Sequence, residues 1–110
     1  MTGTAFSLLS AATVNSTSIK ASPGVITGLF IYNPSVASKF VKLYDKASAP
    51  TVGTDTPKYR LFLPTGAKIE IAGIWLPFAT GIGLGTTLLI ADADATAIAV
   101  ADLLINLVYI

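Results

Sequence analysis

The sequence contains no cysteine and no histidine. A chain without cysteine forms neither disulfides nor thiolate metal sites, and its redox compartment cannot be inferred. Histidine is the commonest general base and the commonest metal ligand, so its absence removes both from the chemistry open to this chain. We therefore expect a protein that is not an enzyme and that needs no metal and no cofactor.

Charged residues are also scarce, at 12% of the 110 residues against about 25% in an ordinary soluble domain. Hydrophobic residues make up 53% of the chain. A chain of this length has room for one domain, which buries roughly 65% of the surface that the unfolded chain exposes. The surplus apolar surface is expected to face another subunit, another protein or a bilayer. A net charge of +1 does not indicate the strongly basic surface that is typical of nucleic-acid-binding proteins.

One segment has to be tested as a membrane span. Residues 71–91 carry no charge, and the segment is about as long as a spanning helix. Pro77 and four glycines interrupt it, and in a helix interior each glycine costs about 1 kcal/mol and proline about 3 kcal/mol. We therefore expect no membrane partner, although a small membrane protein remains the alternative that composition alone favours.

Short runs with strand-like composition alternate with turn residues along the chain. Residues 40–44 and 67–72 have the composition or the alternation of strands, and residues 58–64 are also extended in character. Residues 24–34, 86–91 and 103–110 are apolar on both faces, as expected of strands covered on both sides. Only residues 92–102 have helical composition, and they could also form a loop with a short helical turn.

Turn chemistry separates these runs at short intervals. The signals are Ser22 to Gly24, Asn33–Pro34, Ala49–Pro50, Gly53, Pro57, Pro64 to Gly66, and Pro77. Many short strands with such spacing predict an all-β fold: a single-domain antiparallel β-sandwich or small barrel over residues 1–110, jelly-roll-like.

Three features resemble chemical motifs, and each has a structural interpretation that we prefer. The "GIGLG" segment at 81–85 lacks the Lys-Ser/Thr of a phosphate-binding loop, so we expect a tight turn or bulge. Asp92 and Asp94 are two positions apart, as the first two ligands of a calcium-binding loop are, but the remaining ligands of such a loop are missing. We therefore expect a solvated turn. The carboxylates of Asp45, Asp55 and Glu70 are expected to form surface ion pairs with nearby lysines rather than a catalytic pair.

The candidate partner-binding residues are basic or aromatic. Six of the seven basic residues lie between positions 39 and 68, and four of them flank the long polar segment 46–57: Lys42, Lys46, Lys58 and Arg60. They form either a solvated face or a patch that docks on an acidic partner. Trp75 and the other aromatic residues are expected mostly in the core. Alternatively, two or three of them anchor an interface, or an exposed Trp75 and tyrosines stack on sugars.

The segments "KLYDKASAPTVGTDTP" (42–57) with "LPTG" after it, and "FATGI" (78–82), carry a resemblance. Over nearly the whole chain, the sequence resembles small proteins encoded among the virion structural genes of tailed bacteriophages. The resemblance implies a β-sandwich without enzymatic activity that decorates or cements the capsid and is located in the virion. It implies the major capsid protein or other virion proteins as partners.

A homo-oligomer is expected as well, with a trimer favoured because trimers suit the threefold positions of an icosahedral shell. The alternatives are a fibre- or tail-associated binding module and a small phage membrane protein such as a holin. In the leading interpretation, the segment 46–57 is a connection between two strands that faces the partner.

Overall fold

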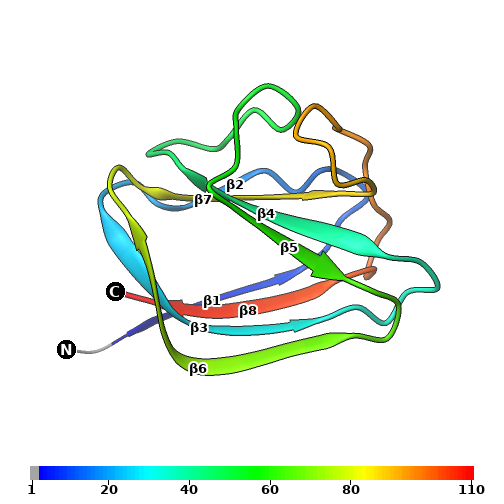
Figure 1. Cartoon of the computed structure of the whole chain (residues 1–110), viewed down its shortest axis with the longest axis horizontal. Coiled ribbons are helices and arrows are strands. Elements are labelled where there is room, and N and C mark those ends of the chain that lie inside the picture. The colour runs from blue at the N-terminus through cyan, green and yellow to red at the C-terminus, as the bar shows by residue number, and fades with distance from the viewer. Residues whose placement is uncertain (1–2) are drawn as a thin grey trace.

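The computed structural model describes residues 3–110, and within that range it consists of strands and loops without a helix (Figure 1). The strands are β1 (Thr4–Leu9), β2 (Thr17–Lys20), β3 (Gly24–Tyr32), β4 (Lys39–Asp45), β5 (Tyr59–Leu63), β6 (Lys68–Phe78), β7 (Ile82–Thr87) and β8 (Leu104–Tyr109). They form two four-stranded sheets with the orders β1-β8-β3-β6 and β2-β7-β4-β5.

The strand pairing follows one rule along the whole chain. β1 pairs with β8, β2 with β7, β3 with β6 and β4 with β5, and every pair is antiparallel. The chain is therefore equivalent to one long hairpin, closed at the 46–57 segment, that is wound into two sheets by the additional pairs β3·β8 and β4·β7. This is the topology of a jelly roll, so the predicted all-β, antiparallel, jelly-roll-like fold is confirmed.

The core lies between the two sheets, and alternation along each strand selects its residues. The first sheet contributes apolar side chains such as Leu29 and Ile31, and the second contributes Val41, Leu43 and Leu84, all at most 2% exposed. Complete burial of such a side chain contributes about 1.5 to 3 kcal/mol. The two layers can be followed in Figure 1, with β2, β7, β4 and β5 above and the other sheet below.

The outer faces of the two sheets differ. In β4 and β7 nearly every residue is buried, on the outer face as well as on the inner one. Figure 1 shows the reason, because the β4–β5 and β7–β8 connections both rise over the outer side of this sheet. We call these two connections, residues 46–58 and 88–103, the cover. Within the part of the chain that the structure describes, the first sheet has no such cover, and outward side chains such as Phe30, Tyr32 and Leu104 remain exposed.

The expectation that residues 24–34 and 103–110 are covered on both sides is therefore wrong. A strand can be apolar on both faces and still have one face uncovered. The cover crosses only the sheet that contains β4 and β7, whereas β3 and β8 belong to the other sheet. In the third such run, 86–91, β7 ends at Thr87 and the following residues leave the sheet to enter the cover. The expected helical turn at 92–102 is also absent, and this segment forms turns and irregular loop.

The glycine-rich segment 81–85 was expected to be a tight turn or bulge, and it instead enters and forms β7. A Cβ added to Gly85 would lie 2.5 Å from Cγ2 of Val52, and one added to Gly83 would lie 3.1 Å from Cδ of Pro50. Glycine is used here because the cover lies directly on the strand. Part of the segment 46–57 therefore packs against its own sheet, and Pro50, which belongs to this segment, is buried there.

Pro77 was read as a turn signal and lies within β6. β6 is an edge strand of its sheet, and an edge position tolerates a residue without an N–H. Residues 71–91, weighed above as a membrane span, form most of β6, the turn that follows it, β7 and the start of the β7–β8 connection. Nowhere in residues 3–110 is there a helix long and apolar enough to cross a membrane.

Candidate binding surfaces

Lys42 does not belong to a docking patch, because its side chain is fully buried at 0% exposure. It points to the outer face of β4, where the cover encloses it. Its Nζ donates a hydrogen bond of 2.7 Å to the carbonyl of Ala91. Burial lowers the pKa of Lys42, and the negative charges of Asp94 and Asp92 oppose that decrease. Lys42 therefore fastens the second part of the cover to the sheet.

The other three basic candidates each have an acidic neighbour in the chain. Lys46 Nζ lies 2.7 Å from Asp55 Oδ2, and Lys58 Nζ lies 4.0 Å from an oxygen of Asp45 while donating to the carbonyl of Pro77 at 2.6 Å. The basic charges between positions 42 and 60 are thus largely balanced within the chain. The predicted ion pairs of Asp45 and Asp55 are present. The ion pair expected for Glu70 is not among those found within residues 3–110, so that part of the prediction is wrong.

Arg60 makes the most specific of these pairs. Its Nε and Nη2 donate to the two carboxylate oxygens of Asp92 at 2.6 and 2.5 Å. This bidentate contact lowers the pKa of Asp92 and joins β5 to the cover. Because Arg60 is engaged in this way, it is a poor candidate for capturing an acidic partner.

The acidic pair considered for calcium is also used inside the chain. Asp94 accepts hydrogen bonds from the backbone N–H of Leu89 at 3.1 Å and from the hydroxyl of Thr96 at 2.7 Å. Burial opposes ionisation, but these donors still lower the pKa of Asp94. Such local bonds favour turns over helix, which explains why the predicted helical turn does not form. No group of three or more acidic residues suited to a metal occurs within residues 3–110.

Trp75 is the predicted site residue that lies most openly on the surface, with 65% of its area exposed. It lines an open hollow near the end of β6. We call this the Trp75 hollow, and its lining residues are Lys20, Pro23, Gly24, Val25, Trp75, Pro77, Phe78 and Ile110. Seven of these eight are apolar or glycine. The surface therefore offers apolar area and little charge.

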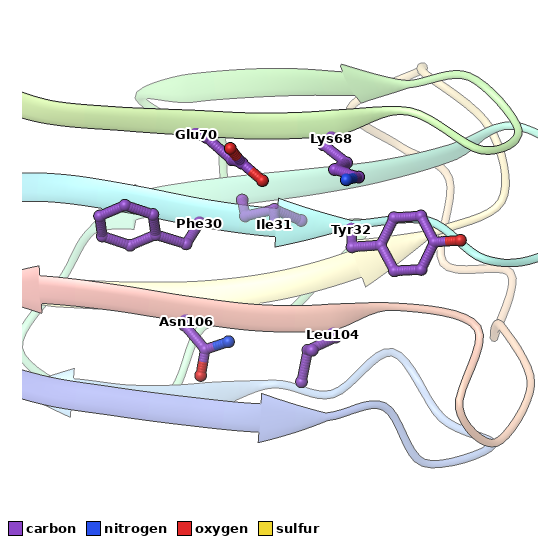
Figure 2. A pocket seen from close by; sticks show the side chains of 7 residues that line it. All are labelled: Phe30, Ile31, Tyr32, Lys68, Glu70, Leu104 and Asn106. Carbon is purple, nitrogen blue, oxygen red and sulfur yellow. The ribbon is translucent and has the colours of Figure 1, made fainter.

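A second open site lies on the uncovered sheet, and sequence reasoning missed it. A hollow of about 160 Å³ lies on β3 and its neighbours. Figure 2 shows the side chains that line it: Phe30, Ile31, Tyr32, Lys68, Glu70, Leu104 and Asn106. We call it the Phe30–Tyr32 site. Phe30 and Tyr32, expected mostly in the core, are 40% and 39% exposed. The alternation of these two residues with the buried Leu29 and Ile31 was the signal that could have revealed it.

Strand register brings this site together from distant parts of the chain. Phe30 on β3 lies opposite Glu70 on β6 and Asn106 on β8. Tyr32 lies opposite Lys68 and Leu104 in the neighbouring row. The site therefore has aromatic rings along its central strand, a carboxylate and an ammonium on one side, and a carboxamide on the other.

No family model matches this chain, and no curated protein or solved structure was found to match it. Its function has to be inferred from its own surfaces and from the resemblance described above.

Proposed function

We propose that this chain is a non-enzymatic structural protein of a bacteriophage virion, a capsid decoration or cement protein that binds the assembled head and stabilises it. The resemblance of residues 42–66 and 78–82 to small virion proteins supports this function. The jelly roll supports it by analogy only, since capsid proteins use this architecture but lectins and other proteins use it too.

The observation that carries the proposal is the Trp75 hollow. An exposed tryptophan beside Pro23, Pro77 and Ile110 contributes little to folding, whereas a partner that covers it would remove a large apolar area from water. Tryptophan is also enriched among the residues that dominate binding energy at interfaces. We therefore assign the capsid-facing surface to the Trp75 hollow rather than to the basic residues near the 46–57 segment.

The proposed partner is the major capsid protein, or another virion protein exposed on the head. A decoration protein meets many equivalent sites on a symmetric shell, so oligomers with several hollows bind more firmly than single copies. A homo-oligomer, with a trimer favoured, matches that geometry. The second candidate function is a fibre- or tail-associated binding module, which the open Phe30–Tyr32 site favours.

The test uses particles that assemble without this protein, mixed with the purified chain and sedimented. Trp75→Ala is expected to weaken binding at least tenfold, since truncating a central anchor commonly costs about 2 kcal/mol or more. Val36→Ala is the matched control, because Val36 is 97% exposed but lies in the β3–β4 connection. Unchanged occupancy by the Trp75→Ala variant would contradict the assignment of the hollow, and absence of any binding by the unmodified chain would contradict the function.

A further inference from the structure

We propose that the Phe30–Tyr32 site binds one neutral pyranose ring of a saccharide. The two rings come from alternate residues of β3, so they stand on the same face about 7 Å apart along the strand. In Figure 2 both rings present a broad face outward from the sheet. Such a face packs against the C–H groups on one side of a pyranose ring.

Gly28 is the reason that the Phe30 ring lies against the sheet. A Cβ at Gly28 would lie only 3.2 Å from Cε2 of Phe30, so the ring occupies the space that a side chain at position 28 would take. Cε2 and Cζ of the ring therefore lie over Gly28, and 40% of Phe30 remains exposed. This is an arrangement for stacking, which a ring standing on edge would not provide.

The polar groups around the rings match hydroxyl groups in type and position. Glu70 offers acceptors, Lys68 offers donors, and the carboxamide of Asn106 across the site offers both. Neither Lys68 nor Glu70 takes part in the ion pairs found within residues 3–110. Their side chains are therefore not committed to another charge of the chain.

Charge and size narrow the ligand class. The lining contains one cation and one carboxylate, so the site has no net charge and favours a neutral ligand over an ionic one. A single lysine is too little to follow a phosphate backbone, which argues against a nucleic acid. With a volume of about 160 Å³ the hollow is smaller than the roughly 300 to 1,000 Å³ typical of drug-sized ligands. It has room for a single ring.

A shallow site of this kind binds weakly. For one ring held by stacking and a few hydrogen bonds, we expect a dissociation constant on the order of 1 mM. The test is a titration of the ¹⁵N-labelled full chain, followed by amide chemical shifts, with the methyl pyranosides of glucose, galactose, mannose and N-acetylglucosamine. Sorbitol, an acyclic polyol without a ring face, is the control ligand.

At least one pyranoside is expected to give saturable shifts confined to β3, β6 and β8 around the site, while sorbitol gives none. Phe30→Ala and Tyr32→Ala should each weaken binding at least tenfold, whereas Trp75→Ala, which removes an exposed aromatic elsewhere, should leave it unchanged. Asn106→Ala and Glu70→Gln change only outward polar groups, and they are expected to weaken binding even if an aromatic variant fails to fold.

Absence of saturable shifts with all four pyranosides would overturn the proposal, as would binding that persists in Phe30→Ala. If Phe30→Ala instead abolishes attachment to particles while no pyranoside binds, the open sheet face belongs to a protein partner and the saccharide site is wrong. That outcome is distinct from a failure of Trp75→Ala to affect particle binding, so the two proposals can be separated.

Discussion

At the residue scale, the cover affects the two neighbouring outward side chains of β4 differently. Lys42 and Tyr44 alternate with core residues and would face water if nothing lay over the sheet. Lys42 finds a carbonyl partner in the cover. The hydroxyl of Tyr44 is buried and has no hydrogen-bond partner among residues 3–110. Burial, with a smaller contribution from the charge of Asp55, raises the pKa of Tyr44 to about 12.

Tyr44→Phe is expected to stabilise the protein at neutral pH. A buried hydroxyl without a partner costs about 1 to 3 kcal/mol of desolvation, and phenylalanine fills nearly the same space without that cost. We expect the free energy of unfolding, measured by urea denaturation, to rise by about 1 kcal/mol. A clear loss of stability would show that the hydroxyl has a partner, such as an ordered water.

The same substitution should change the response to alkali. In the folded state the pKa of Tyr44 is about 12, above the ordinary value of 10.0 that applies to the unfolded chain. The unfolded chain therefore loses this proton first, and stability falls as the pH rises through that interval, by roughly 3 kcal/mol in total at about 1.4 kcal/mol per pKa unit. Tyr44→Phe removes this loss of stability at high pH, because phenylalanine does not titrate. The difference in unfolding free energy between the variant and the original chain should grow above pH 10.0, whereas a constant difference would contradict the raised pKa.

At the element scale, the cover is held by contacts toward both edges of the sheet that it protects, β5 at one edge and β2 at the other. Lys42 and Arg60 bind residues 91 and 92, at the start of the β7–β8 connection. The hydroxyl of Ser16 donates a hydrogen bond of 2.5 Å to the carbonyl of Pro50 in the β4–β5 connection. Between these contacts the glycines of β7 let the connection lie close to the strand. The long polar segment is therefore explained in large part by packing within the chain.

Gly85→Ala is expected to destabilise the fold by about 1 to 3 kcal/mol, because the new methyl group would overlap the side chain of Val52. Adding Val52→Ala removes the overlapping methyl groups, so the double variant should recover part of the loss in urea denaturation. Gly81→Ala is the contrasting case, since its Cβ would lie 2.5 Å from the backbone oxygen of Lys46, where no side-chain truncation makes room. Equal stabilities for Gly85→Ala and the unmodified chain would show that the cover does not rest on β7.

Much of this element structure could be predicted from the sequence. Residues 40–44, 58–64 and 103–110 were read as strands or extended runs, and β4, β5 and β8 lie there because β-branched and aromatic residues fit a pleated surface. β1 and β2 were not predicted, since their Ser-, Thr- and Ala-containing stretches resemble exposed loop. The burial of Lys42 could not be predicted either. The sequence pattern around a lysine between Val41 and Leu43 is the same whether the side chain faces water or is covered by a distant loop.

The candidate sites, too, could be predicted only in part from the sequence, because distant segments complete them. Trp75 was singled out and is exposed, but its neighbours Pro23 and Ile110 come from distant parts of the chain. The Phe30–Tyr32 site depends on strand register, which sets Glu70 and Asn106 on either side of one ring. Hydrophobic pattern indicates which residues share a face of a strand. Whether another segment crosses that face follows only from the fold.

At the scale of the whole molecule, the sandwich has one outer face that its own loops close and one that stays open. The closed side shields a lysine and a tyrosine that would otherwise face solvent. The open sheet presents the Phe30–Tyr32 site, and the hollow near the end of β6 presents Trp75.

The most direct test of attachment through the Trp75 hollow is a cryo-EM reconstruction, at side-chain resolution, of the particle formed in cells that express this chain. We expect density for this jelly roll on the outside of the head, with Trp75 buried against the major capsid protein and Phe30 and Tyr32 facing solvent. A trimer at the threefold positions is the arrangement we expect. Particles that lack the chain, or a bound chain whose Trp75 hollow is open to solvent, would contradict it.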